Sequence, residues 1–389
     1  METSTPLDHF VSMLKANQRL KSARLEHAVR AVPRQWFVSR MHTRSKYLRF
    51  INVNTSRPTR HQLERIYSDE ALLSRRDPPS STSQPSLVMN MLEALDIRPG
   101  ARVLEIGAGT GWNAALMAHL VGSSGSVVSI DNQPDVARNA RRHIKRAGLK
   151  NVHIVTGDGA NGYPKAALYD RLITTVSCPD VFPTWLQQLK PRGIAVITLS
   201  ELPGESWCLM LKLRKTKIHL TGEVVSLPGF MLFTGQHGSP PTASQAQQRL
   251  DEYAGAKVRK HRAVWASLPG QGDIMMRRDL AFFAHLEGLR VESLGNRFVL
   301  SAPDHRGLCV LDNAHIDVID GPECYSLYEK IQDKWLHLGA PKRLQYRVEV
   351  WPLAVKKRQP RDGWLTRRAH CQLIFQLKQE VSSYKEINL

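Results

Sequence analysis

The chain has 389 residues, which at roughly 150 residues per domain predicts about two domains. Hydrophobic residues make up 42% of it and charged residues 23%, so the composition excludes a disordered chain. The formal net charge of +19 favours an anionic partner, which could be nucleic acid, an acidic peptide or an anionic membrane surface.

No stretch approaches the roughly 20 apolar residues that cross a bilayer, and the segment Met1 to Asn17 lacks the apolar centre of a signal peptide. We therefore expect a cytoplasmic protein that makes no use of a membrane. The cysteines are odd in number and form no CxxC pair, so we expect buried reduced thiols and neither disulfides nor a metal site. They are Cys178, Cys208, Cys309, Cys324 and Cys371.

Residues 1–80 are predicted to form an N-terminal helical arm followed by a cover loop. Apolar residues recur at helical spacing from Leu7 to Val38. The polar stretch from Met41 to Pro79 is interrupted by prolines, and a short helix is expected there from His61 to Leu73.

Residues 81–237 alternate between predicted strands and helices. A helix begins after the hydroxyl residues that precede Pro85 and ends near Asp96. Strands then alternate with helices, which requires parallel pairing with both faces of the sheet covered, as in a doubly wound Rossmann-like α/β fold. The predicted strands are Arg102 to Ile106, Ser126 to Ile130, Val152 to Thr156, Tyr169 to Thr175 and Gly193 to Leu199. The predicted helices begin near Trp112 and span Pro134 to Ala147 and Val181 to Leu189.

Residues 238–389 have a different pattern and predict a small C-terminal α+β domain that recognises the substrate. The linker is marked by Gly238 to Pro241. The expected elements are Leu280 to Leu286, Phe298 to Leu300, Cys309 to Leu311, the helix Tyr325 to Leu338 and the strand Arg343 to Trp351.

The glycine-rich turn after the first strand is the candidate ligand site, because open parallel sheets bind ligands at the carboxyl ends of their strands. Trp112 occupies the position of the third glycine of a dinucleotide fingerprint, which argues against a nicotinamide cofactor. Successive strand ends offer Glu105 for an ammonium group or for ordering the turn, Asp131 for ribose hydroxyls and Asp158 for the adenine amino group. This series predicts an S-adenosylmethionine site, although a glycine turn can arise by chance and a strand-end Asp is often a helix cap. The predicted cofactor residues are Glu105, Gly107, Gly109, Gly111, Asp131, Asn132, Gly157, Asp158 and Gly159.

Several segments resemble those of the protein-L-isoaspartate O-methyltransferase family, and the resemblance covers about Leu7 to Leu199. They are Val32 to Val38, Ser83 to Val88, Val103 to Trp112, and Gly157 to Gly159 followed by Gly162 and Tyr163. The resemblance implies a class I methyltransferase in which a peptide carboxylate attacks the methyl group of S-adenosylmethionine. The products are a methyl ester and S-adenosylhomocysteine, and the ester then cyclises to a succinimide. By similarity Ser83, Ser81 and Thr82 would hold the substrate; the alternative is that these hydroxyls only cap the helix at Ser86.

The chain departs from the family at two places where the peptide should bind. Pro79 to Ser81 replaces a glycine-glutamine approach, and Thr198 to Glu201 replaces a Leu-Pro-Val-Gly segment. The extended chain resembles aspartimide-forming methyltransferases of ribosomally made peptides, and Tyr325 to Lys330 with Trp335 to Gly339 resembles their C-terminal region. Peptide-specific aspartimide formation and general isoaspartate repair therefore both stay open.

Basic residues gather between Lys342 and Arg368, with only Glu349 and Asp362 among them, and predict either a solvated face or a dock for an acidic peptide. A nucleic-acid methyltransferase is a second hypothesis: Cys178, after the fourth strand, stands where some base methyltransferases carry a nucleophile. A third is a binding module without turnover.

Overall fold

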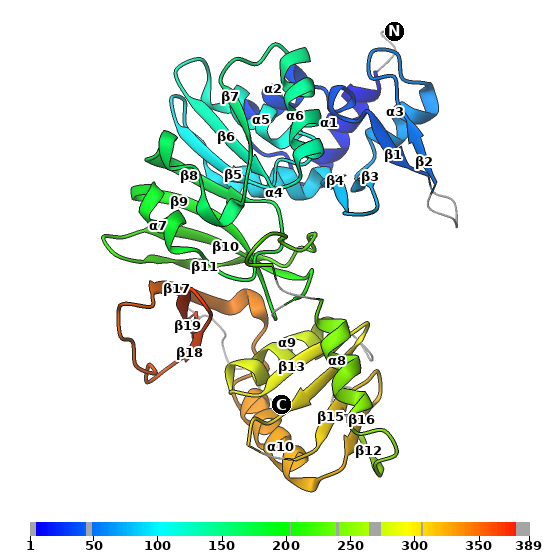
Figure 1. Cartoon of the computed structure of the whole chain (residues 1–389), viewed down its shortest axis with the longest axis vertical. Helices are drawn as coiled ribbons and strands as arrows, with labels where there is room; N and C mark the ends of the chain where they lie inside the picture. The colour runs from blue at the N-terminus through cyan, green and yellow to red at the C-terminus, as the bar shows by residue number, and fades with distance from the viewer. Residues whose placement is uncertain are drawn as a thin grey trace, which may run out of the picture.

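The computed structural model describes residues 5–43, 49–202, 204–238, 241–263, 274–304 and 306–378. Figure 1 shows the N-terminal elements beside one end of a long central sheet, and a second sheet with its own helices beyond the other end. No helix in these ranges is long and apolar enough to cross a membrane.

The central sheet has ten strands in the order β18-β19-β17-β11-β10-β9-β8-β5-β6-β7. The five predicted strands pair in parallel, which confirms the doubly wound Rossmann-like fold. They are β5 (Arg102–Ile106), β6 (Ser126–Asp131), β7 (Val152–Thr156), β8 (Tyr169–Thr174) and β9 (Leu189–Ser200). The last of these is longer than the predicted strand from Gly193 to Leu199.

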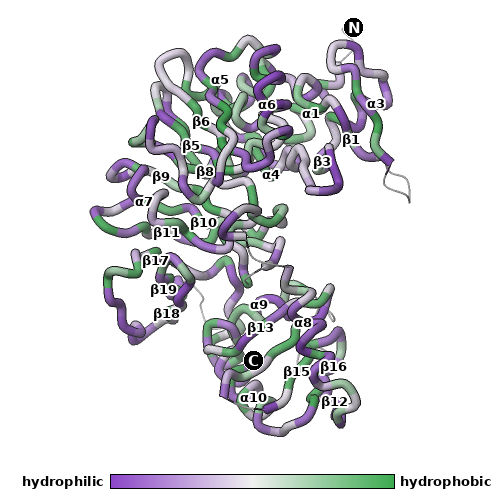
Figure 2. The backbone as a smooth tube through the Cα atoms, in the orientation of Figure 1, coloured by the Kyte–Doolittle hydropathy of each residue, from purple (hydrophilic) through white to green (hydrophobic). Residues whose placement is uncertain are grey.

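Alternate side chains of these strands enter two different cores, so both faces of the sheet are covered. Val103 of β5 packs with the helices α4 (Pro85–Leu95), α5 (Trp112–Val121) and α6 (Pro134–Arg146). Its neighbour Leu104 packs on the opposite face, with α7 (Pro183–Gln188) and residues of the C-terminal region. In Figure 2 hydrophobic residues accordingly concentrate along the strands, while α6 carries many hydrophilic ones.

The N-terminal arm consists of α1 (Pro6–Ala16), α2 (Ala23–Ala31) and the 3-10 turn η1 (Arg34–Phe37), and it packs on the face of α4 and α5. It is followed by β1 (Arg40–His42), β2 (Phe50–Asn52), α3 (Arg60–Ile66), β3 (Leu72–Arg75) and β4 (Ser80–Thr82). The predicted helix from His61 to Leu73 is wrong in its second half, because the buried Arg34 guanidinium donates to the carbonyl oxygens of Ile66, Ser68 and Glu70 and turns the chain into β3.

The sheet continues past β9 with antiparallel strands, four of which no sequence pattern had predicted. Two of these four form the hairpin β10 (Cys208–Lys215) and β11 (Leu220–Ser226), and the other two are β18 and β19. Next to the hairpin lie β17 (Tyr346–Pro352), β19 (Cys371–Leu377) and β18 (Trp364–Arg367), so the end of the C-terminal region extends the central sheet. The domain boundaries drawn at 80/81 and 237/238 stay predictions.

The rest of the C-terminal region forms the expected α+β unit around a second, antiparallel sheet in the order β12-β16-β15-β14-β13. Its strands are β12 (Val258–Arg262), β13 (Arg290–Leu294), β14 (Arg297–Ser301), β15 (Leu308–Leu311) and β16 (His315–Ile319). Its helices are α8 (Thr242–Asp251), α9 (Ile274–Leu286) and α10 (Pro322–His337).

A buried ion-pair network joins this unit to the central sheet. Glu201, directly after β9, pairs with Arg343 and, at 3.1 Å, with Arg278 of α9. Arg278 also pairs with Glu205 at 3.2 Å, and Arg343 pairs with Asp279 at 2.7 Å. Because buried charges are costly unless paired, the network holds the two sheets in one arrangement.

Candidate active site

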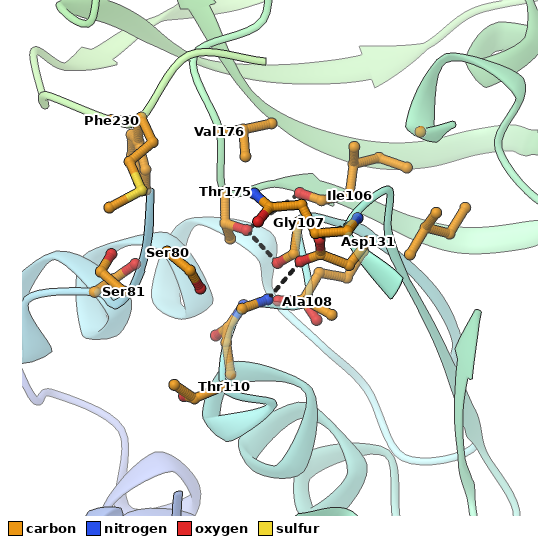
Figure 3. A pocket seen from close by; sticks show the side chains of 18 of the residues that line it. Ser80, Ser81, Ile106, Gly107, Ala108, Thr110, Asp131, Thr175, Val176 and Phe230 are labelled. Atoms are coloured by element: carbon orange, nitrogen blue, oxygen red, sulfur yellow. Dashed lines mark hydrogen bonds between the residues drawn. The ribbon is translucent and has the colours of Figure 1, made fainter. Parts of the chain in front are cut away.

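A cavity opens at the carboxyl ends of the parallel strands, where β5 lies between β6 and β8. The glycine turn after β5 forms one wall, the β3–β4 hairpin a second and the loop after β11 a third (Figure 3). The lining includes Ser80 to Ser83, Glu105 to Thr110, Trp112, Asn113, Ile130 to Gln133, Gly159, Thr175, Val176 and Phe230 to Thr234. This is the switch point at which such sheets bind ligands.

The turn after β5 requires glycine at its crowded positions. Gly107 has φ +100, and a Cβ there would lie 2.6 Å from Oγ1 of Thr175. That hydroxyl donates to the Gly107 carbonyl oxygen at 2.6 Å, so the turn is fastened to the end of β8. Gly109 has φ +52, and a Cβ there would lie 3.0 Å from the Ser81 carbonyl oxygen. The turn and the β3–β4 hairpin therefore meet backbone to backbone.

Glu105 is fully buried beneath the turn and also lines the cavity. Its carboxylate accepts hydrogen bonds of 2.6 Å from Asn113 Nδ2 and from Ser129 Oγ. Burial raises the pKa of Glu105 to about 7, although both hydrogen bonds oppose that shift. The side chain thus orders the turn, and its ligand role stays a prediction.

Asp131 ends β6 and turns its carboxylate back to the glycine turn. Oδ2 accepts from the Gly109 N–H at 3.0 Å, and Oδ1 accepts from the Gln133 N–H at 3.1 Å. Burial raises the pKa of Asp131. Asn132 donates to Thr234 Oγ1 at 2.8 Å, which ties this strand end to the loop after β11. Both predicted residues line the cavity, and their roles toward a cofactor stay predictions.

Of the segment after β7, Gly159 lines the cavity and is tightly packed: a Cβ there would lie 2.4 Å from Ile106 Cγ2. Asp158 accepts from the Ala160 N–H at 2.9 Å and caps the short 3-10 turn η2 (Gly159–Asn161). Its other oxygen accepts from the Gln236 N–H at 3.3 Å. Gly157 and Gly111 flank the lining rather than join it, and Gly111, with φ +88, is the N-cap residue directly before α5. The adenine role of Asp158 stays a prediction.

The three predicted substrate-binding hydroxyls all line the cavity, and in Figure 3 Ser81 lies across it from Asp131. The α4 N-terminus has no side-chain cap from the hydroxyl residues. Instead Asp69 accepts from the Ser86 N–H at 2.8 Å. Thr82 donates to Thr110 Oγ1 at 3.0 Å, so the alternative reading of these hydroxyls as caps of α4 is not what the structure shows.

The third wall was missed from sequence. The loop after β11 pairs with the segment after β8, as the Ser177 N–H donates to Met231 O at 2.7 Å and the Phe233 N–H donates to Ser177 O at 2.9 Å. This short ladder carries Phe230 and Phe233 over the cavity. The available signal was an apolar run between two turn-forming positions, Gly229 and Gly235.

Two buried acceptors on the lining have no hydrogen-bond partner within the described part of the chain: Asn113 Oδ1 and Gln133 Oε1. Unpaired buried acceptors are costly, so they favour a ligand that brings N–H or O–H donors. The ammonium group and ribose hydroxyls of S-adenosylmethionine are such donors, so the residues present fit this molecule. Fold and pocket together define an S-adenosylmethionine-dependent methyltransferase of the Rossmann-like class.

The particular family follows from comparison with known proteins. The family model described as protein-L-isoaspartate(D-aspartate) O-methyltransferase matches residues 6–224, more than half of the chain, and the chain belongs to this family. It is 35% identical to the protein-L-isoaspartate O-methyltransferase of Pyrococcus horikoshii over 59% of this chain and 92% of that protein. It is 36% identical to protein-L-isoaspartate O-methyltransferase 2 of Archaeoglobus fulgidus over 49% of this chain and 76% of that one. A solved protein-L-isoaspartate O-methyltransferase superposes with a TM-score of 0.54 and 25% identity, covering 88% of this chain and 96% of its own.

Family membership identifies the chain as a methyltransferase and argues against a binding module without turnover. Cys178 is unsuited to be the nucleophile of a nucleic-acid methyltransferase, because it is fully buried in the core and burial raises the pKa of its thiol to about 12. A thiol in that state supplies almost no thiolate at neutral pH. All five cysteines are buried and free.

Proposed function

We propose that the enzyme esterifies the carboxylate of an aspartyl or isoaspartyl residue in a peptide or protein and so prepares that residue for ring closure. The observation that carries this proposal is that the hydroxyl groups of β4 line one side of the cavity, while Glu105, Asp131 and the glycine turn line the other. The first can hold an anionic oxygen, and the second offers acceptors to a cationic methyl donor.

The chemistry needs orientation more than acid–base help. S-adenosylmethionine supplies an activated methyl group when bound; one carboxylate oxygen of the peptide forms the new O–C bond as the S–C bond breaks and its electron pair stays on sulfur. A carboxylate is already ionised at neutral pH, so no base is required. Ser81, Thr82 and Ser83 would position the carboxylate, while Phe230 and Phe233 exclude water from the cavity. Attack by the next backbone nitrogen on the ester then releases methanol and closes the succinimide.

Incubation with a radiolabelled methyl donor and three acceptors tests the proposal: an isoaspartyl peptide, a constrained aspartyl peptide and RNA. Label should enter one or both peptides and not RNA. Mass spectrometry should show the gain of one methyl group followed by loss of methanol. No transfer to either peptide would refute the proposal.

Peptide-specific aspartimide formation is the finer alternative, and one observation favours it over general repair. Ser200 and Glu201, where the chain departs from its family, are buried under C-terminal residues. Arg368 donates to the Ser200 carbonyl oxygen at 2.8 Å, and Arg343 binds the Glu201 carboxylate. The C-terminal region thus covers a surface where a general peptide was expected to bind. Faster methylation of constrained aspartyl peptides than of linear isoaspartyl peptides would support this alternative, and the reverse order would exclude it.

An acidic substrate held by basic C-terminal residues is also part of the proposal. The structure divides the basic cluster in two, since Arg343 is occupied in buried contacts and Arg368 in partly buried ones, while Arg347, Arg358 and Arg367 are exposed. The exposed residues can attract an acidic peptide, and affinity should then fall steeply with added salt. Salt-independent affinity for acidic peptides would count against this part.

We also propose a cytoplasmic location, because five buried free thiols suit a reducing compartment. Fractionation of cells that express the chain, followed by immunodetection, tests this directly.

A further inference from the structure

A second, larger cavity lies between the central sheet and the C-terminal α+β unit. It comprises about 1730 Å³ of space, part of which is open to solvent, and apart from Gln245 and Pro303 its lining comes from four segments. They are the segment 179–182 after β8, residues 237–238, the stretch 285–292 from α9 into β13, and residues 365–370 from β18 to the start of β19. The cavity depends on the C-terminal region for most of its lining.

The acidic groups of this cavity are already occupied. Asp180 accepts from the His370 N–H at 2.6 Å and from the Cys371 thiol at 2.8 Å. Glu292 binds Arg290 at 2.8 Å and lies 3.5 Å from Arg249. Glu292 is therefore already ion-paired, and Asp180 is buried with both of its carboxylate oxygens hydrogen-bonded.

Several nitrogen-bearing groups of the lining are unoccupied. Arg367 is exposed on the edge strand β18 and has no ion-pair partner among the described residues. The rings of His237 and His370 meet edge to face at 4.8 Å, and within the described ranges their ring nitrogens make no hydrogen bond. Arg368, by contrast, donates hydrogen bonds to the carbonyl oxygens of Pro179 and Ser200. The unsatisfied hydrogen-bonding capacity of the cavity is thus mainly that of donors.

The two cavities share a wall. The Phe233 ring, which lines the methyl-transfer cavity, lies 5.6 Å from the Phe182 ring, which lines the second one. The centroid of the Phe182 ring also lies 5.3 Å from that of the His237 ring and 5.1 Å from that of the His370 ring. The Phe182 and Phe233 rings therefore form part of the wall between the two cavities.

We propose that this cavity binds a carboxylate side chain of the peptide substrate, at a residue other than the one that is methylated. The inference rests on the proposed function, since it assigns a second recognition point to the same substrate. Arg367 offers a planar guanidinium for bidentate binding, and the two histidine rings offer further N–H donors. Partial enclosure between the sheets strengthens such charge-assisted contacts relative to the open surface.

The test uses paired isoaspartyl peptides that carry either two glutamates or two glutamines at a series of distances from the isoaspartyl residue. At the favourable spacing the glutamate peptide should have a KM about tenfold lower than its glutamine partner, with kcat unchanged. Arg367→Gln should remove most of that difference. Arg361→Gln is the matched control, because Arg361 is exposed in the loop before β18 and lines neither cavity.

Calorimetric titration of the same peptides into the full chain separates this inference from the proposed function. Binding decides the inference even if neither isoaspartyl peptide is methylated, and methylation of the constrained aspartyl peptide then decides the proposed function. Preference of the wild type for glutamate over glutamine, lost in Arg367→Gln and kept in Arg361→Gln, supports the site. Equal affinity for the two peptides at every spacing, or equal effects of the two variants, overturns it.

Discussion

Glu105 offers the sharpest test of how the glycine turn is built, since one substitution separates its two roles. Glu105→Gln keeps the shape of the side chain and can keep hydrogen bonds to Asn113 and Ser129. Burial raises the pKa of Glu105 from 4.5 to about 7. At about 1.4 kcal/mol per pKa unit, this shift corresponds to roughly 3 kcal/mol by which the ionised group destabilises the fold.

The sign of the pH dependence follows from the direction of the shift. Below pH 4.5 Glu105 is protonated in both the folded and the unfolded chain, so it contributes no difference. As pH rises from 4.5 to about 7, the unfolded chain loses this proton first and the folded state loses stability. Above pH 7 the loss is complete, and glutamine avoids it. Glu105→Gln should therefore unfold at a higher urea concentration than the wild type at pH 8. Its free energy of unfolding should be about 3 kcal/mol larger there, with little difference near pH 4.5.

Calorimetry with S-adenosylhomocysteine then tests the ligand role. If Glu105 accepts a hydrogen bond from the ammonium group, the same variant should bind more weakly at pH 8, by about 1.5–3 kcal/mol, despite its greater stability. Unchanged affinity would leave Glu105 only its structural role. A variant no more stable than the wild type at pH 8 would refute the reasoning about its burial.

Three further substitutions probe other parts of the molecule. Asp131→Ala should weaken S-adenosylhomocysteine binding by about 2–4 kcal/mol in calorimetry, through loss of hydrogen bonds to a charged acceptor, and an unchanged Kd would remove the ribose role. Arg343→Met leaves Asp279 and Glu201 short of a partner and should lower the free energy of unfolding by about 3–5 kcal/mol in urea titrations; a loss below about 1 kcal/mol would contradict the network. Cys178→Ala should keep kcat for an isoaspartyl peptide, and a collapse of kcat in a folded variant would restore a chemical role for the thiol.

The parallel half of the sheet could be predicted because each strand is a short apolar run that ends at a polar or glycine-rich turn, as at Glu105 to Gly107 and at Asp131. Both faces are buried, so the local pattern alone identifies such strands. The hairpin of β10 and β11 could not be predicted in the same way, because its place depends on pairing with β9 and β17. These contacts are remote in sequence and leave little local signal.

The residues of the candidate site also fall into those marked by local sequence and those placed by remote contacts. Glu105, Asp131 and the hydroxyls from Ser81 to Ser83 were predicted because they adjoin a turn or a helix start that the sequence itself marks. Phe230 and Phe233 were missed, because the loop that carries them acquires its position only by pairing with Ser177. Asp69 was also missed, since its capping of α4 spans 17 residues.

The departures from the family sequence acquire a physical meaning only in three dimensions. Glu201 is a poor residue for a surface that receives a carboxylate, since like charges repel. Buried against Arg278 and Arg343, it instead fastens the C-terminal unit to the end of β9. The same region contributes most of the second cavity, including Arg367. Where a general peptide surface is expected, the chain instead attaches its C-terminal unit, and this would narrow the range of substrates. The same unit supplies a second recognition site, and the comparison of Arg367→Gln with Arg361→Gln tests whether substrates use it.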